Sequence, residues 1–216
     1  MEILWHGHSF FEIETKTEKG KIKVAIDPFS PEIGLKAPKV RADLLLISHD
    51  HFDHNYKEAI EGNYFLIDKP GEYEVGGVFV TAILSFHDSV KGKSRGENLI
   101  FLLDSEEMRV CHLGDFGQKE LENHQLEKIG QVDLLMIPVG GKYTISAKEA
   151  IKILEQIEPK ITIPMHYFLP KLKIKLDGAE EFLKVLGIKE LKPEKKLSIK
   201  KENLPEEGKI VLLEPK

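Results

Sequence analysis

Short apolar runs separated by turn residues dominate most of the chain. Some runs alternate with polar positions, whereas "LLLIS" at 44–48 is continuous, which is typical of a strand covered on both faces. Gly, Pro, Asn and Asp stand between the runs and indicate turns. The pattern predicts strands at 2–5, 9–15, 21–27, 44–48, 76–84, 98–104, 108–114, 132–139, 160–166 and 209–214.

Helical periodicity is clearest late in the chain. Ser146 and Glu149 have the spacing of a capping box before apolar residues that share one face, which predicts a helix over 147–157. Asp177 and Glu180 repeat this signal before a further helix. Strands crowd the first half, and helices alternate with strands in the second. This order is rich in strands but does not by itself define the topology.

Composition narrows the class of protein. The 216 residues include no low-complexity linker, so we predict a single domain spanning 1–216. The net charge of −5 argues against a polynucleotide-binding surface. The single cysteine, Cys111, excludes an internal disulfide and favours a reducing compartment. No stretch resembles a signal peptide or a membrane span, so we expect a cytoplasmic protein without a membrane partner.

Five metal-binding side chains lie within the six residues that follow "LLLIS". In a helix, His49 and His51 would point about 200° apart and could not share an ion. In an extended or looped backbone they face the same side and can chelate one metal. Asp53 and His54 would then turn toward a second position. The alternative is a solvated polar loop, but such loops rarely need three imidazoles.

The order H-x-H-x-D-H after an apolar strand resembles the metallo-β-lactamase superfamily. Three later motifs are also similar to this family: "SFHDS" with His87, "HLGDFG" with Asp115 and "IPMHY" with His166. "WHGHSFFEIE", "AIDPF" and "PVGGKYTISAKEA" resemble the branch of ascorbate-6-phosphate lactonase-like proteins. The resemblance implies an α+β fold, a four-layer αββα sandwich in which helices cover two mixed sheets and a dinuclear metal site lies at one edge.

The resemblance also implies the ligands of two divalent ions per chain. The first ion would take His49, His51 and His87, and the second Asp53, His54 and His166, with Asp115 bridging both. Imidazoles and carboxylates favour Zn²⁺, with Mn²⁺, Fe²⁺ and Ni²⁺ as alternatives. Ions about 3.5–4 Å apart would activate a bridging water and polarise the scissile bond. Asp53 and Asp115 are the catalytic candidates, because Asp53 could orient the hydroxide or accept its proton.

Other residues are candidates for substrate contact. Lys93 and Arg95 lie in a glycine-containing loop that either holds an anionic group or is solvated surface. The similarity to the lactonase-like branch favours anion binding, and Tyr143 could line the same pocket. In an extended "CHLGD", His112 points away from the face that carries Asp115. We therefore expect His112 to contact substrate or support a ligand rather than bind metal.

Two residues near the N-terminus are candidates for supporting the metal ligands. His8 has i, i+2 spacing with His6, but the family pattern has no ligand there. Support of a ligand, lining of the pocket and a plain turn therefore all stay open for His8. Asp27 either steadies the metal loop or caps the "DPFSP" turn, and spacing alone favours the turn.

These observations predict a metal-dependent hydrolase that uses a metal-bridged hydroxide on a small, anionic ester, lactone or phosphoester. A nuclease or phosphodiesterase of the same fold is the alternative. The RNA-processing members usually carry an inserted domain, for which this chain has no room. A non-hydrolytic di-iron redox protein is a third hypothesis, which His51 opposes because those members carry Glu there. The expected partner is a small molecule, and a homo-oligomer stays open.

Overall fold

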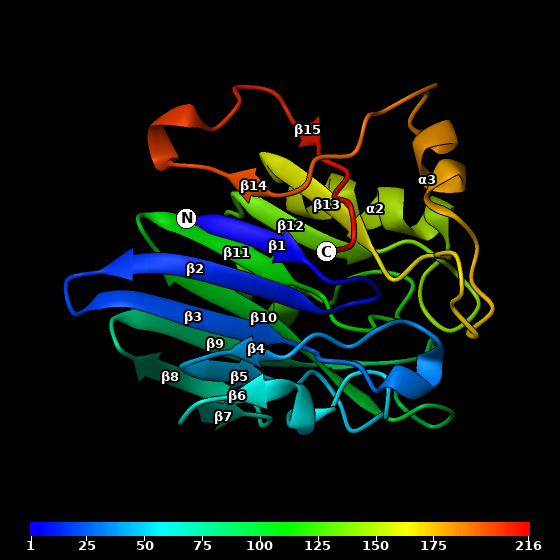
Figure 1. Ribbon diagram of the computed structural model, residues 1–216. Helices are drawn as coiled ribbons and strands as arrows, with labels where there is room; N and C mark the ends of the chain where they lie inside the picture. The colour runs from blue at the N-terminus through cyan, green and yellow to red at the C-terminus, as the bar shows by residue number, and fades with distance from the viewer.

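Two mixed β-sheets lie face to face in the computed structural model, which describes residues 1–216 (Figure 1). The first sheet has six strands, four of which pair antiparallel while the last two add in parallel. In spatial order they are β14 (Leu197–Ser198), β1 (Glu2–Trp5), β2 (Phe11–Thr17), β3 (Gly20–Ile26), β5 (Leu44–Leu46) and β7 (Phe65–Ile67).

The second sheet has seven strands and the same division into an antiparallel and a parallel part. In spatial order they are β15 (Lys209–Ile210), β13 (Ile161–Met165), β12 (Leu134–Pro138), β11 (Met108–His112), β10 (Glu97–Ser105), β9 (Val78–Phe86) and β8 (Gly71–Val75). A separate parallel pair consists of β4 (Val40–Arg41) and β6 (Ile60–Glu61).

The burial of each strand follows its apolar pattern. In β2, Phe11, Ile13 and Thr15 are buried while the residues between them are partly exposed, because alternate side chains face the core. In β10, every residue from Asn98 to Leu103 is buried, as a continuous apolar run predicts. The sheets thereby share one hydrophobic core of 59 buried residues.

Three α-helices and three 3₁₀ turns complete the fold. The helix α2 (Ala147–Ile157) begins at the predicted capping box, in which Ser146 N–H donates to Glu149 at 2.8 Å. In Figure 1, α2 lies behind β12 and β13, on the outer side of the second sheet. The remaining elements are α1 (Asn123–Ile129), α3 (Ala179–Val185), η1 (Pro31–Ile33), η2 (Lys57–Ala59) and η3 (Lys201–Asn203).

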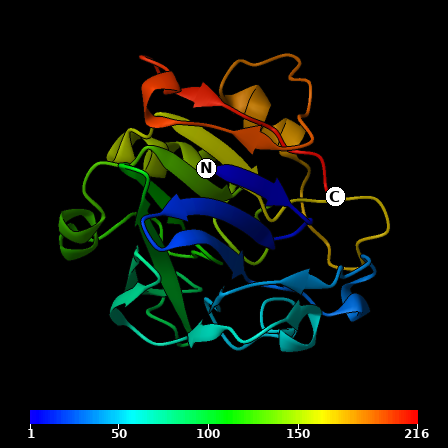
Figure 2. The ribbon, with the colours of Figure 1, turned by 60° about the vertical axis from the view of Figure 1, so that its left-hand side comes forward.

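The C-terminal segment closes the same edge of both sheets. β14 pairs with β1 at the edge of the first sheet, and β15 pairs with β13 at the edge of the second. Figures 1 and 2 show this orange and red segment lying across the top of the sandwich. The outer edge of β1 in the first sheet and that of β13 in the second sheet are therefore both covered. The carboxyl ends of these strands stay free to carry a site.

The α+β sandwich that the sequence predicts is confirmed. The structure differs from the strand predictions in two ways. The short strands β4, β6, β7, β8 and β14 were not predicted, and the last strand is limited to Lys209–Ile210 rather than extending to 214. β8 is an edge strand whose glutamates alternate along "GEYEV", so it has no apolar run to reveal it.

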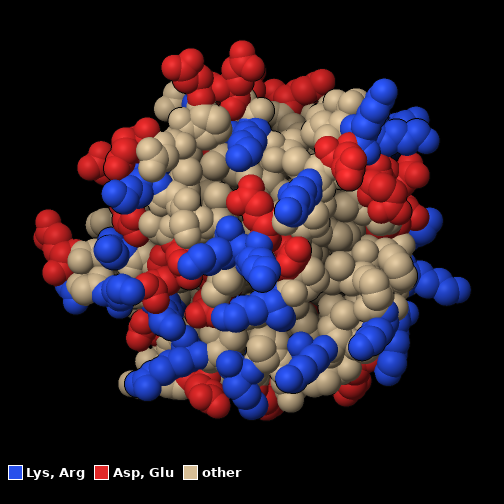
Figure 3. Space-filling view, turned by 45° about the horizontal axis from the view of Figure 1, so that its top comes forward, with Lys and Arg blue, Asp and Glu red and all other residues tan.

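The surface carries charges of both signs. On the face shown in Figure 3, Lys and Arg are interspersed with Asp and Glu, so no continuous field of one sign covers it. None of the helices has the length and apolar character required to cross a membrane.

Candidate metal centre

Polar residues that follow four strands meet at one end of the sandwich. The segment 49–54 follows β5, His87 follows β9, Asp115 follows β11 and His166 follows β13. They form three groups, within each of which the ligating atoms lie within 4.8 Å of one another. The groups are His49, His51 and His87; His49, His54 and Asp115; and His8, Asp53, His54 and His166. All seven predicted ligands thus lie together, and His8 joins them.

Asp115 lies between the histidines of the two predicted sites. Its Oδ2 is 3.1 Å from Nε2 of His87 and 3.1 Å from Nε2 of His166. Its Oδ1 is 3.2 Å from Nε2 of His54. One carboxylate therefore contacts the predicted ligands of both ions, which is the position that a bridging ligand needs.

The backbone around Asp115 is held by Asn98, which the sequence analysis missed. Oδ1 of Asn98 accepts the N–H of Asp115 at 2.9 Å, and its Nδ2 donates to the carbonyl oxygen of Leu113 at 2.9 Å. Gly114 has φ of 57°, and a Cβ there would lie 2.3 Å from Asn98 Oδ1. A glycine is therefore required. The only sequence signal for Asn98 is one amide at the start of an apolar run.

Asp27 lies behind the metal loop and is fully buried. Its carboxylate accepts the N–H of Ser48 at 2.7 Å and the Ser48 hydroxyl at 2.6 Å, and it lies 3.1 Å from Nδ1 of His54. Ser48 Oγ is also 2.9 Å from Nδ1 of His49. The Asp27 side chain thus contacts the metal loop, and Nε2 of His54 is left facing Asp115. Ser48, the last residue of "LLLIS", was not predicted.

Burial and mutual contact set the charge states in the cluster. Burial, together with the neighbouring His54, lowers the pKa of His49 well below its usual value. Burial opposes ionisation of Asp115, but His166 and His54 outweigh it and hold its pKa well below the usual range. Burial also disfavours a charged His54, but Asp115 and Asp53 raise its pKa well above the usual value. Asp115 is therefore ionised, and it favours positive charge on the neighbouring His54, whereas His49 is neutral.

The donor set fits divalent cations. His49 Nε2, His54 Nε2 and Asp115 Oδ1 are buried and make no hydrogen bond of good geometry, although His54 Nε2 and Asp115 Oδ1 lie 3.2 Å apart. Buried polar atoms of this kind normally find a partner. Neutral imidazole nitrogens and ionised carboxylate oxygens are also the ligand forms that Zn²⁺ and similar ions require.

Three residues of the cluster have a left-handed backbone. The φ angles are 53° at His8, 50° at Asp27 and 52° at His166. Non-glycine residues adopt this region rarely, and such residues concentrate at functional sites. Each of the three lies just beyond the end of a strand, where the chain turns sharply toward the cluster.

A cavity of about 490 Å³ opens beside the cluster and is lined by His49, His51 and Arg95 among others. Its charged lining is balanced, with three cationic side chains (Lys57, Lys69, Arg95) and three acidic ones (Asp50, Asp68, Glu97). Its volume lies in the range of small-molecule sites.

Only part of the glycine-containing loop that carries Lys93 and Arg95 lines this cavity. Arg95 lines the cavity, and its guanidinium lies 5.5 Å above the ring centre of Tyr143. Neither Lys93 nor Tyr143 lines the cavity. The loop is ordered by Asp88, whose carboxylate accepts four backbone N–H groups, including that of Arg95 at 2.8 Å.

The structure does not bring His112 to the cavity. The side chain is fully buried and its Nε2 lies 3.2 Å from the carbonyl oxygen of Ser9. Its Nδ1 accepts the N–H of Gly114 at 3.1 Å. Both ring nitrogens are therefore engaged with backbone, in a position that supports the turn before Asp115.

Comparison with known proteins supports this picture. The model of the beta-lactamase superfamily domain matches residues 2–166. The chain belongs to the metallo-β-lactamase superfamily. Curated relatives named "UPF0173 metal-dependent hydrolase" include one from Thermococcus onnurineus, 31% identical over 88% of this chain and 93% of the relative. Another, from Archaeoglobus fulgidus, is 30% identical over 77% of this chain and 83% of the relative.

Solved structures agree with membership of the metallo-β-lactamase superfamily. A protein from Thermotoga maritima, described as a candidate Zn-dependent hydrolase of this superfamily, is 35% identical and has a TM-score of 0.80. The match covers 98% of this chain and 97% of that one. A metallo-hydrolase from Ignicoccus hospitalis, 18% identical with a TM-score of 0.61 over 92% and 99% of the chains, shares the fold. With its cluster of histidine and aspartate ligands, the protein is a metal-dependent hydrolase of this superfamily.

Proposed function

We propose that this metallo-β-lactamase superfamily protein hydrolyses a small anionic ester, lactone or phosphoester at a centre of two divalent ions. The observation that supports this proposal is the meeting of all seven predicted ligands beside a cavity of about 490 Å³. Residues 1–216 act as one domain in this proposal, because both sheets share one core.

The histidines and carboxylates divide between the two ions. His49, His51 and His87 would hold the first ion, and Asp53, His54 and His166 would hold the second, while Asp115, which contacts histidines of both sets, would serve both. The donor atoms favour Zn²⁺, with Mn²⁺, Fe²⁺ and Ni²⁺ as alternatives. Bound there, the ions would supply Lewis acidity that activates a water and polarises the scissile bond.

Side chains in and behind the metal centre orient the reactants. Burial opposes ionisation of Asp53, but His54 and His8 outweigh it and lower its pKa, so its carboxylate is ionised at neutral pH. An ionised carboxylate at this place can accept a hydrogen bond from the attacking water and hold it in position. Asp27 and Ser48 hold the histidines from behind, which fixes their ring orientation.

The preference for an anionic substrate follows from the charge balance. The charged side chains that line the cavity cancel, three against three. Two divalent ions bring four positive charges, against two negative charges on Asp53 and Asp115, so the loaded centre is cationic. Arg95 at the rim adds a planar, bidentate donor for a phosphate or carboxylate group. Lys93 stays a candidate for longer substrates, because it lies in the same loop.

A substrate screen tests this function. The purified protein is freed of metal, reloaded with Zn²⁺, Mn²⁺, Fe²⁺ or Ni²⁺, and assayed on lactones, carboxylic esters, phosphomonoesters, phosphodiesters and RNA. Hydrolysis of a small anionic compound should depend on metal and be lost in Asp115→Asn, while the exposed control His124→Ala keeps it. Activity on RNA alone would favour the nuclease alternative. Equal activity without metal would refute the proposal.

A further inference from the structure

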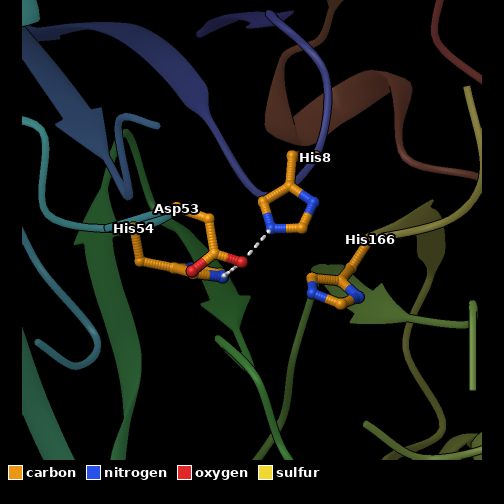
Figure 4. Close-up of side chains that lie close together, drawn as sticks. All are labelled: His8, Asp53, His54 and His166. Carbon is orange, nitrogen blue, oxygen red and sulfur yellow. Dashed lines mark hydrogen bonds and ion pairs between the residues drawn. The ribbon is translucent and has the colours of Figure 1, made fainter. Parts of the chain in front are cut away.

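His8 belongs to the same group of ligating atoms as the predicted second site. It lies in the loop between β1 and β2, far in sequence from the metal loop, and its side chain is fully buried. Its Nε2 lies 3.1 Å from Oδ2 of Asp53. Its ring centre lies 4.2 Å from that of His166 and 4.9 Å from that of His54. Figure 4 shows these four side chains converging from three separate segments.

The backbone holds His8 in this position. Gly7 and His8 have φ angles of 100° and 53°, which turn the chain back sharply after β1. The carbonyl oxygen of His8 accepts two hydrogen bonds, from Nε1 of Trp5 at 3.0 Å and from the N–H of His166 at 2.9 Å. His8 is therefore tied directly to the segment that carries another ligand, and its ring has little freedom to turn away.

We infer that His8 is a fourth protein ligand of the second metal, together with Asp53, His54 and His166. This inference rests on the proposed dinuclear function. A histidine that only supported Asp53 would lie behind the carboxylate, as Asp27 lies behind His54. His8 instead presents a ring nitrogen within 4.8 Å of the ligating atoms of all three other residues.

The distances suit coordination of one ion. Donor atoms bonded to one Zn²⁺ at about 2.0–2.1 Å lie roughly 2.9–3.6 Å apart in four- or five-coordinate geometry. The separation of 3.1 Å between His8 Nε2 and Asp53 Oδ2 lies within that range. Nδ1 of His8 has no hydrogen-bond partner, so Nε2 is the only ring nitrogen with a polar contact.

A fourth ligand makes the two metals unequal. With Asp115 as a bridge, the second ion would have five protein ligands, one more than the first. The first ion would have three histidines and Asp115, and it would lie beside the cavity, which His49 and His51 line. No member of the His8 group lines that cavity. The second ion is therefore the retained one, and the first is exchangeable and faces the substrate.

Metal binding by matched variants tests this inference. Supporting residues typically change metal affinity by about 10–100-fold. Loss of a ligand in His8→Ala should weaken binding of one equivalent by more than roughly 100-fold. His8→Gln should lose as much, because its amide can donate to Asp53 but is a poor ligand for Zn²⁺. His6→Gln is the control, since His6 is also buried but belongs to none of the three groups.

Calorimetric titration with Zn²⁺ and elemental analysis after dialysis against a chelator supply the readout, and thermal unfolding of each apoprotein checks its fold. The unaltered protein should retain one equivalent and release the other, whereas both His8 variants should release both. If His8→Ala does not fold, His8→Gln decides. If His8→Gln retains one equivalent of metal after dialysis, as the unaltered protein does, His8 only hydrogen-bonds Asp53 and the inference is overturned. Failure of the unaltered protein to bind two ions would instead refute the dinuclear function.

Discussion

Replacement of Asp27 by Asn should weaken the second metal site while leaving the fold intact. Asp27 accepts three contacts with its two oxygens: Ser48 N–H at Oδ1, and the Ser48 hydroxyl and His54 Nδ1 at Oδ2. With Asp27 as acceptor, His54 carries its proton on Nδ1 and presents the lone pair of Nε2 to the metal. An Asn that keeps its oxygen on Ser48 N–H places its NH₂ group against His54. The imidazole must then accept at Nδ1 and protonate Nε2, which blocks coordination.

The magnitude follows from the kind of contact that is lost. Outer partners of metal-bound histidines contribute about 10–100-fold to metal affinity. This corresponds to roughly 1.4–2.7 kcal/mol for one of the two ions. The apoprotein should lose little stability in Asp27→Asn, because the Ser48 hydroxyl can rotate and accept from the new amide. Asp27→Ala should cost several kcal/mol, since it leaves buried donors unpaired at about 1–3 kcal/mol each.

The assay is calorimetric titration of Zn²⁺ into the apoproteins, together with urea unfolding in a chelator. Asp50→Asn is the control for charge, because Asp50 is an exposed carboxylate in the same loop whose side chain hydrogen-bonds Asn55 and none of the histidines. Asp27→Asn should bind one ion as the unaltered protein does and the other more weakly, and Asp50→Asn should bind both normally. Two unchanged affinities in Asp27→Asn would refute the argument from the His54 tautomer.

Three further predictions concern other parts of the molecule. Arg95→Ala should lower kcat/KM on an anionic substrate without loss of metal, by a factor that corresponds to about 1.5–3 kcal/mol of activation free energy. Unchanged kinetics would show that the loop does not bind the substrate. His87→Ala should lose one metal whereas His112→Ala keeps both, as elemental analysis would show; the reverse would contradict the strand geometry. Phe101→Ala, fully buried in β10, should destabilise the apoprotein by about 3–5 kcal/mol in urea unfolding, and a loss below 1 kcal/mol would contradict its core position.

Sequence patterns predicted the central strands well because each has a signal of its own. β5, β10 and β12 are continuous apolar runs, and they are buried along almost their whole length. The start of α3 was predicted less well. Gly178 rather than Asp177 precedes its first turn, and the Asp177 side chain pairs with Lys142 at 3.2 Å. Asp177 therefore makes a tertiary ion pair instead of the helix cap that its local spacing suggested.

The metal loop could be predicted because its ligands are adjacent in sequence. The residues that support it could not, because their role depends on where strand ends meet. Asp27 follows β3, Ser48 follows β5 and Asn98 lies in β10, and nothing in the local sequence of each indicates the others. His8 shows the same limit, since its spacing with His6 suggested a pair, whereas the structure brings it to Asp53 instead.

The left-handed backbone at His8, Asp27 and His166 has an evolutionary consequence. Such a conformation costs on the order of 1 kcal/mol for a non-glycine residue, and His and Asp tolerate it better than most. Glycine would remove the cost at each position, but it carries no side chain to serve the cluster. A descendant of this fold that had lost its chemistry could therefore gain stability by drifting to glycine at these places. Imidazole and carboxylate groups at these places in active relatives, with glycine in inactive ones, would be the trace of selection for activity against selection for stability.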